Sequence, residues 1–358
     1  MSNTWGNEIR LSIFGESHGG GIGMILDGVV PGIQLNIDEI QKQMARRAPG
    51  GALATPRKEA DEVEFLSGVV DGVTCGSPIC GVIRNTNTRS KDYGKTKDWM
   101  RPSHADYTAR IKYGGFADFR GGGHFSGRLT APLVLAGSIC GQVLEQKFGL
   151  QAGSHIVRLG EYTEDNWDRP DADLLRKMEE SRIPCQNPQK VAEIIEEARM
   201  AADSVGGMVE TALTGIPAGL GDPFFDSLES RIAHLLFSVP AVKSVSFGAG
   251  ERFAAMRGSK ANDAFCLREG KVQTQTNHNG GILGGISTGM PVVFSTVLKP
   301  TPSIGQVQSS VNMETMQEEE NQIVGRHDPC IVLRAIPVLE AVAKIALYDA
   351  WKGSEPHA

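Results

Sequence analysis

The amino-acid sequence predicts an α+β fold with antiparallel β-sheets, formed by two copies of a strand–helix–hairpin–helix unit in one domain spanning 1–358. Hairpin-like segments dominate and strands do not alternate strictly with helices, which argues against a doubly wound parallel sheet. Glycine- and proline-marked segments of the first half recur in the same order in the second half. The composition, 40% hydrophobic and 22% charged, is that of a globular protein with a sizeable core.

The first half supplies the elements of one unit in order. We expect strands at 9–14 and 22–26, where short apolar runs precede glycine-rich turns. A helix is expected at 38–47, and the segment 68–83 alternates and turns like a β-hairpin. The apolar segment 129–144 is expected to form a second helix, which follows a glycine-rich turn.

The second half follows an acidic, polar region in which 189–203 has the apolar spacing of an amphipathic helix, most simply a surface helix. Further helices are expected at 226–236 and within 325–347, with a hairpin-like segment starting at 281 between them. Residues 305–324 are polar and acidic, so we expect a loop or lid there.

The internal repeat is read from matching turns. The glycines and proline at 68, 72, 76 and 78 are matched at 281, 285, 289 and 291, an offset of 213. Segments near 27 and 128 have weaker counterparts at offsets of 187 and 206, in the same order. The repeat therefore predicts pseudo-symmetric halves at about 8–150 and 205–350, with chance similarity among glycine-rich turns as the alternative.

Charge and cysteine patterns exclude several classes of protein. The net charge is −6, yet residues 41–130 carry 15 Lys and Arg against 9 Asp and Glu. This basic island fits a site for a small polyanion better than a nucleic-acid surface, although a solvated charged surface is the alternative. No apolar run is long enough to span a membrane, no export signal is seen, and no CxxC pair occurs among six cysteines. We therefore expect a soluble cytoplasmic protein without disulfides, bound metal, nucleic acid or membrane.

The stretch 101–128 concentrates chemistry-bearing residues. It contains His104, His124 and three consecutive glycines at 121–123, followed by Ser126 and Arg128. A glycine-rich turn before a helix presents backbone N–H groups to an anion, whereas the simpler alternative is a flexible basic loop. His18 also lies at the end of an expected strand, beside glycines, where loops commonly carry function. Neither a dinucleotide-binding GxGxxG nor a P-loop is present.

Six motifs in order carry a resemblance to a known family: GESHG (15–19), RPSHADYT (101–108), RGGGxxSxR (120–128), GGILGGIS (280–287), KPT (299–301) and RHDPC (326–330). Together they resemble chorismate synthase from about residue 5 to 350. The resemblance implies a single-domain sandwich of helices between antiparallel β-sheets with an internal pseudo-two-fold, and a homotetramer.

The resemblance also implies a reaction. It is the 1,4-anti elimination of phosphate from 5-enolpyruvylshikimate 3-phosphate to give chorismate, in the shikimate pathway to aromatic amino acids. Reduced FMN is required without net redox change, and NADP is a further ligand that the resemblance suggests. No extra domain for flavin reduction is evident, so we expect reduced FMN from outside.

Site residues follow by motif match. His104 would be the acid that helps phosphate leave, His18 would keep the reduced flavin suitably protonated, and Asp328 would assist proton removal. Arginines are candidates for binding substrate anions, because planar guanidinium groups suit phosphate and carboxylate; they are Arg47, Arg57 and Arg128. The expected flavin contacts are His124, Phe125, Ser126, Lys260, Ala261, Gly284, Lys299, Pro300, Thr301, Pro302, Ser303 and Arg326, the last also a candidate anion clamp.

Two departures from the family pattern affect this assignment. Many members have RSSAR where this chain has HFSGR at 124–128, so stacking or a backbone N–H replaces a guanidinium there. The usual arginine after the PG of the basic loop is missing from 51–55, and Arg57 or Lys58 would substitute, or nothing does. A flavin-dependent oxidoreductase and a non-catalytic binder of phosphorylated small molecules are the rival functions. The joint presence of His18, His104 and Asp328 favours the lyase.

Overall fold

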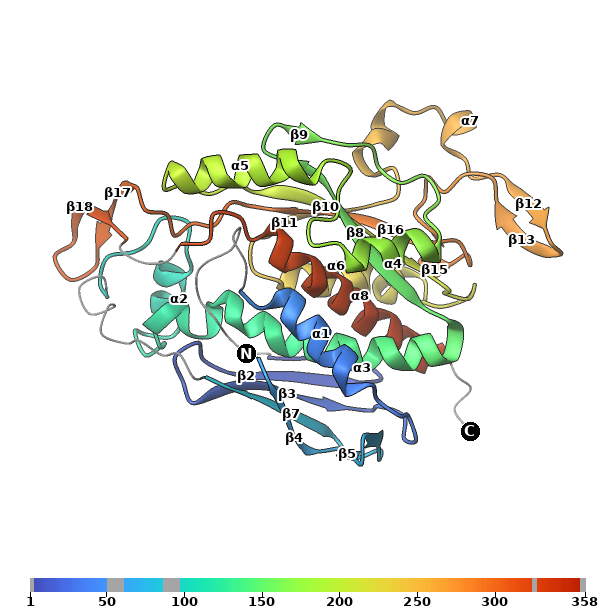
Figure 1. Cartoon of the computed structure of the whole chain (residues 1–358), viewed down its shortest axis with the longest axis horizontal. Helices are drawn as coiled ribbons and strands as arrows, with labels where there is room; N and C mark the ends of the chain where they lie inside the picture. The colour runs from blue at the N-terminus through green and yellow to red at the C-terminus, as the bar shows by residue number, and fades with distance from the viewer. Residues whose placement is uncertain (1–2, 50–60, 86–96, 324–326, 355–358) are drawn as a thin grey trace.

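The computed structural model of the chain describes residues 3–49, 61–85, 97–323 and 327–354. Two antiparallel five-stranded sheets enclose a layer of helices, and two more helices cover the outer face of the second sheet (Figure 1). This is the α+β sandwich that the sequence and its resemblance predict.

The first sheet is formed by the N-terminal part of the chain, and each neighbouring pair of its strands is antiparallel. In spatial order its strands are β1 (Thr4–Trp5), β2 (Arg10–Gly15), β3 (Gly21–Asp27), β7 (Ile79–Arg84) and β4 (Val63–Ser67). The expected strands at 9–14 and 22–26 correspond to β2 and β3. A short turn joins them, and His18 lies in that turn.

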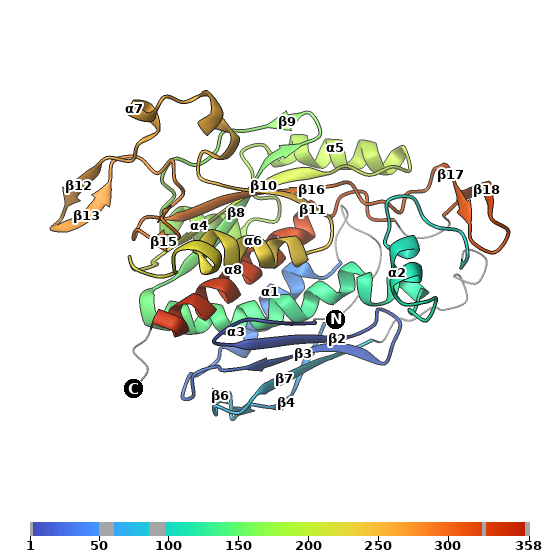
Figure 2. The same cartoon turned by 180° about the vertical axis from the view of Figure 1, so that it is seen from behind.

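The second sheet lies on the other side of the helical layer (Figure 2). In spatial order its strands are β11 (Val242–Phe247), β16 (Val292–Leu298), β10 (Gly207–Thr214), β8 (Gln151–Leu159) and β9 (Tyr162–Thr163). The outer helices are α4 (Ala172–Glu180) and α5 (Pro188–Met200), which begin at side-chain caps from Asp171 and Asn187. Helix α5 is the amphipathic helix expected at 189–203.

The helical layer contains α1 (Ile37–Arg47), α3 (Thr130–Phe148), α6 (Leu228–Ser238) and α8 (Val332–Ser354). Helix α1 begins where the Asn36 side chain accepts a hydrogen bond from the Glu39 N–H, and it ends with two arginines that suit its C-terminal dipole. Helices α3 and α8 pack closely because Gly137 lacks a side chain. A Cβ there would lie 2.4 Å from the Cβ of Ala341.

The core helix α3 explains an apparent membrane signal. Arg120–Phe148 is the one helical stretch, among the described residues, long and apolar enough to cross a membrane, yet nearly all of its most apolar 18-residue window is buried inside the protein. Its apolar character on every side follows from its place between a sheet and the other helices.

The repeat is visible in the order of elements. The first half runs β2, β3, α1, β4, β7, α3, and the second runs β8, β10, α6, β11, β16, α8. Each half also has a small two-stranded ladder before its β7 or β16 strand. These ladders are β5 (Val69–Val70) with β6 (Val73–Thr74), and β14 (Ile282–Leu283) with β15 (Ile286–Ser287). In this correspondence β8 matches β2, so the second half begins at Gln151 rather than at about 205. Helices α4 and α5 are an insertion between β8 and β10.

Residues 307–322 form a hairpin, so this part of the segment expected to be a loop or lid has regular structure. Strands β17 (Val307–Asn312) and β18 (Gln317–Gln322) pair across a turn in which the Asn312 side chain accepts hydrogen bonds from backbone N–H groups. Both faces are polar, so no apolar alternation marked the strands in the sequence. The buried ring of Trp99 donates a hydrogen bond to the Glu319 carbonyl and holds the hairpin beside the 101–104 segment.

The remaining elements lie at the two ends of the molecule (Figure 1). Helix α2 (Asp106–Lys112) lies at the same end as the β17–β18 hairpin. Helix α7 (Gly258–Ala261) and the hairpin of β12 (Phe265–Arg268) with β13 (Lys271–Thr274) project from the opposite end. Short 3-10 turns at 120–125, 127–129, 224–226 and 250–255 complete the described structure.

Candidate active site

The glycine turn at 121–123 adopts a backbone that only glycine tolerates well. All three residues have positive φ, at 59°, 83° and 54°. The run does not open the long helix directly, because a second 3-10 turn, Gly127–Leu129, intervenes and α3 begins only at Thr130. The Ser126 hydroxyl caps this second turn by accepting from the Arg128 N–H. Because these residues lack side chains, neighbouring side chains can pack directly against the backbone of the glycine turn.

Two of the predicted catalytic histidines lie against this turn. A Cβ on Gly121 would lie 2.2 Å from Cε1 of His18, and a Cβ on Gly122 would lie 3.3 Å from Cε1 of His104. The two imidazole rings thus occupy neighbouring places along one turn, although 86 positions separate them in the chain (104 − 18). The Ser17 N–H also donates to the Gly123 carbonyl at 3.1 Å, which ties the His18 turn to the glycines.

His104 is oriented by a carboxylate. Its Nδ1 lies 2.7 Å from Oδ1 of Asp106, while Arg101 holds both oxygens of Asp106 at 2.6 and 2.7 Å. Burial would raise the pKa of Asp106, but hydrogen bonds from Arg101 and His104 outweigh it and lower that pKa. An ionised Asp106 keeps the proton on Nδ1 and leaves Nε2 directed at Gly122, with no hydrogen bond to a described residue.

The Lys299 segment is joined to the His104 turn. The Lys299 ammonium donates to the carbonyl and hydroxyl oxygens of Ser103, at 2.6 and 2.9 Å. Burial, with the nearby Lys243 charge, lowers the pKa of Lys299. Further along, the Ser204 hydroxyl fixes the Thr301 carbonyl at 2.7 Å, while the buried Thr301 hydroxyl has no partner among the described residues. The run Lys299–Ser303 thus places the Thr301 hydroxyl, which has no partner among the described residues, at the end of the protein where His104 lies.

The 124–126 segment is partly used for structure. His124 bonds the Gly15 carbonyl through Nδ1 at 2.8 Å, at the end of β2. The Phe125 ring is 37% exposed and rests near Tyr113, with ring centroids 6.1 Å apart. At the positions where many family members have arginine and serine, this chain therefore offers an anchored imidazole and a partly exposed aromatic face.

The predicted substrate arginines Arg47 and Arg128 share one carboxylate, which sequence reasoning missed. Asp61 is buried between them, 2.5 Å from the Arg47 guanidinium and also in contact with Arg128. Burial would raise the pKa of Asp61, but the charges of the two arginines outweigh it and lower that pKa. Burial also lowers the pKa of Arg47. Two cations on one anion leave this cluster net positive, which suits an anionic ligand.

Arg47 and the third predicted catalytic residue, Asp328, are connected through Arg334, which sequence reasoning also missed. Arg334 donates to Asp328 at 2.7 Å and to the Arg47 carbonyl at 3.1 Å. A signal existed, because Arg334 lies 206 positions after Arg128, the same offset that relates the two core helices in the repeat (334 − 128). Asp61 had no comparable signal, since its partners come from distant segments.

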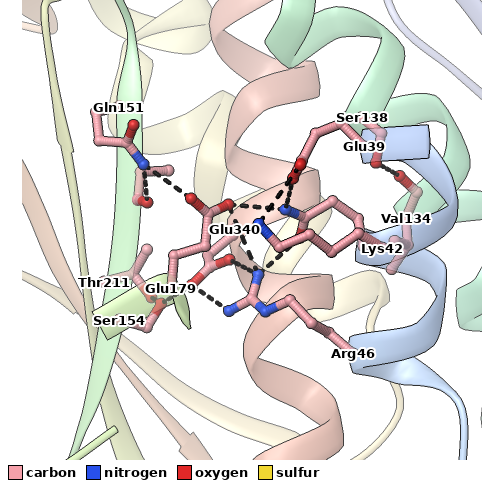
Figure 3. A network of polar contacts seen from close by, with 12 residues as sticks. Glu39, Lys42, Arg46, Val134, Ser138, Gln151, Ser154, Glu179, Thr211 and Glu340 are labelled. Carbon is pink, nitrogen blue, oxygen red and sulfur yellow. Dashed lines mark hydrogen bonds and ion pairs between the residues drawn. The ribbon is translucent and has the colours of Figure 1, made fainter. Parts of the chain in front are cut away.

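The C-terminal turn of α1, which carries Arg47, is anchored by buried polar contacts with α8. Arg46 donates to the buried carboxylate of Glu340 on α8 at 2.7 Å (Figure 3). Glu340 also accepts from Ser154 on β8 at 3.0 Å, so that one carboxylate joins α1, α8 and the second sheet. This buried network fixes the C-terminal turn of α1, and therefore the position of Arg47, relative to α8 and the second sheet.

The predicted site residues do not all converge. Lys260 and Ala261 lie on α7, and Gly284 lies in the turn between β14 and β15, at the end of the molecule away from α2 and the histidines (Figures 1 and 2). Arg57 and Arg326 lie outside the described residues. Within the described part of the chain, no group of three His, Cys, Asp or Glu residues could hold a metal ion.

Comparisons with known proteins identify the family of this chain. The family model of chorismate synthase matches residues 9–351. The chorismate synthase of Dehalococcoides mccartyi strain 195 is 43% identical over 98% of this chain and 96% of that protein. The one from Thermococcus gammatolerans is 41% identical over 97% of this chain and 99% of that protein. A crystal structure of a chorismate synthase superposes with a TM-score of 0.74 at 29% identity, covering 97% of this chain and 92% of that one. The chain belongs to the chorismate synthase family of lyases.

Proposed function

We propose that this enzyme converts 5-enolpyruvylshikimate 3-phosphate to chorismate and phosphate by 1,4-anti elimination, with reduced FMN and without net redox change. The observation that carries the proposal is the pairing of two imidazoles, His18 and His104, on successive glycines of one turn. An acid and a positively charged surrounding are what the departure of an allylic phosphate requires.

The residues fit a bound flavin by two observations. The glycine turn brings its backbone directly against both histidines, and the buried Thr301 hydroxyl has no hydrogen-bond partner among the described residues. The residues at this end that would hold the cofactor are His124, Phe125, Ser126 and the run Lys299, Pro300, Thr301, Pro302 and Ser303. Reduced FMN, when bound, supplies transient electron density that favours loss of the phosphate.

Each residue of the chain then has a distinct task. His104, with Nδ1–H held by Asp106, donates the Nε2 proton of its imidazolium form to the leaving phosphate and becomes a neutral imidazole. His18 holds a proton beside the cofactor. Asp328, kept in place by Arg334, assists removal of the ring proton. Arg47 and Arg128 attract the substrate anions through the net positive charge of their cluster with Asp61.

We also propose that the active form is a cytoplasmic homotetramer and that each chain is one domain. A second copy would explain how Lys260, Ala261 and Gly284 take part in a flavin site although they lie far from the histidines of their own chain. The single domain is supported by one apolar core that contains residues of both halves, including α3 and α8.

An anaerobic assay with pre-reduced FMN tests the reaction, with phosphate release from 5-enolpyruvylshikimate 3-phosphate as the measured quantity. We expect many turnovers for each flavin. Oxidation of one flavin per product would instead identify a flavin-dependent oxidoreductase. Binding of the substrate without phosphate release would identify a non-catalytic binder of phosphorylated small molecules.

A further inference from the structure

Asn85, the residue after β7, connects the His18 turn to Arg128. Its side-chain amide donates to the carbonyl oxygens of Glu16 and Gly19, both at 3.0 Å. Its side-chain oxygen accepts from Nε of Arg128 at 3.2 Å. We propose that Asn85 is a positioning residue that fixes the histidine turn and the arginine relative to each other.

The chemistry of the three partners selects an amide at this place. The two carbonyls need donors and the guanidinium needs an acceptor, and the Asn side chain has both. The opposite orientation of the amide would direct its oxygen at two carbonyls and its N–H groups at a cation. The orientation of the amide is therefore determined by its partners, and the hydrogen bonds to Glu16, Gly19 and Arg128 all fit it.

The contacts also show why His18 depends on Asn85. The carbonyls of Glu16 and Gly19 flank His18 in the chain, and the Gly19 N–H closes the turn on the Glu16 carbonyl at 3.0 Å. The Asn85 N–H lies 3.3 Å from the next carbonyl, that of Gly20. Asn85 thus holds both sides of the turn that directs the His18 ring onto Gly121.

The hydrogen bonds of Asn85 to described residues go to the His18 turn and to Arg128, so it acts through these two rather than on the reacting atoms. Loss of the two carbonyl contacts frees the His18 ring, which affects the chemical step. Loss of the Arg128 contact frees a substrate-binding cation, which affects binding. These two effects separate because they come from different ends of one amide. The assignment of the two effects rests on the proposed function.

The experiment compares Asn85→Asp with Asn85→Ala. Aspartate keeps an acceptor for Arg128 but places negative charge against two carbonyls and cancels the net positive charge of the arginine cluster, so we expect kcat to fall and KM to rise. Alanine removes all three side-chain contacts without adding charge, so we expect kcat to fall with a smaller rise in KM. The loss in kcat should be on the order of 10- to 100-fold, because a misplacement of about 1 Å costs up to about 10²-fold.

A matched control is Asn187→Asp. The Asn187 side chain caps α5 by accepting from the Lys190 N–H at 3.1 Å, a task that aspartate performs equally well. The same chemical change should therefore leave kcat, KM and thermal stability unaltered there.

The ring signal of His18, followed by NMR without substrate and assigned with a His18→Gln variant, gives a readout that does not depend on the reaction. We expect it to move in both Asn85 variants and to stay fixed in Asn187→Asp. If the enzyme releases no phosphate but the signal moves, the positioning role stands and the proposed function fails. Unchanged kcat, KM and His18 signal in a folded Asn85→Ala would overturn the inference, whatever Asn85→Asp does.

Discussion

Two histidines of this protein, His104 and His155, each contact carboxylates, yet their surroundings differ. His155 on β8 is 1% exposed, and both of its ring nitrogens are used, Nδ1 on Glu164 and Nε2 on Glu210 at 3.1 Å. The Trp167 ring also stacks on it, with centroids 4.0 Å apart. His104 is anchored through Nδ1 alone and directs Nε2 at a glycine. An imidazole with both ring nitrogens hydrogen-bonded to carboxylates has a structural role, whereas one with a single nitrogen bonded in this way can transfer a proton through the other.

The two histidines also differ in the groups that contact their carboxylate partners. Arg101 neutralises Asp106 beside His104, so that one carboxylate orients the ring without surrounding it by negative charge. At His155 no described arginine or lysine pairs with Glu164 or Glu210, and their other partners are neutral groups, including Tyr162 and Asn166. The His155 cluster therefore depends on the imidazole for its positive charge.

The largest expected effect is on catalysis. Replacing His104 by alanine should lower kcat by roughly 10²–10⁴-fold, the usual contribution of general acid–base catalysis. Binding of reduced FMN should fall much less if the residue acts mainly on the phosphate. The measurements are kcat from anaerobic phosphate release and the melting temperature, which should stay close to that of the unaltered enzyme. Full kcat in a folded His104→Ala would contradict the assignment.

The same substitution at His155 should act on stability. Removing the imidazole leaves Glu164 and Glu210 buried without their positive partner, and breaking a buried pair costs roughly 3–5 kcal/mol. Urea unfolding of His155→Ala measures this loss of unfolding free energy. The fraction that remains folded should retain kcat. A folded His155→Ala with normal stability and no activity would reverse the comparison.

Replacing Asp106 should lower kcat less than replacing His104, and it tests the orientation of the His104 ring specifically. Asp106→Asn keeps the shape but removes the charge that binds Arg101 and orients His104. Hydrogen bonds to charged groups contribute about 1.5–3 kcal/mol, so kcat should fall by roughly 10- to 100-fold. Glu164→Gln is the matched control, since it alters the carboxylate of the other histidine and should affect unfolding free energy before kcat.

Sequence reasoning found the parts of the site that are marked by local patterns. The two-copy organisation, the antiparallel sheets and the place of His104 in one stretch with the glycine run follow from turns, periodicity and motifs, and the sandwich follows from the family resemblance. The contact of His18 with the glycines at 121–123 was not predicted. Asp61 and Asn85 could not be found in this way, because their roles arise only in space. Asp61 lies between Arg47 at the end of α1 and Arg128, and Asn85 lies between the His18 turn and Arg128. The polar hairpin at 307–322 also escaped, since strands with two polar faces carry no apolar alternation.

The smallest effect is a pH dependence that belongs to His155. Burial alone would lower the pKa of His155, but the hydrogen bonds that its ring donates to Glu164 and Glu210 outweigh burial and raise that pKa. A raised folded-state pKa means that the contribution to stability is complete below about pH 6.5, the ordinary value for histidine. It is then lost as the pH rises through the folded-state value, by up to about 1.4 kcal/mol per pH unit.

His155→Gln lacks this titration and provides the reference. Urea unfolding at pH 5.5, 7 and 8.5 should show that the excess stability of the unaltered protein over His155→Gln shrinks as the pH rises. At pH 5.5 the lowered pKa of Glu164 keeps that carboxylate ionised, so its own contribution, complete above about pH 4.3, does not obscure the trend. An excess that stays constant or grows toward pH 8.5 would mean that His155 is neutral in the folded protein. The contrast with His104 would then rest on the two bonded ring nitrogens and the stacked Trp167 ring, and not on charge.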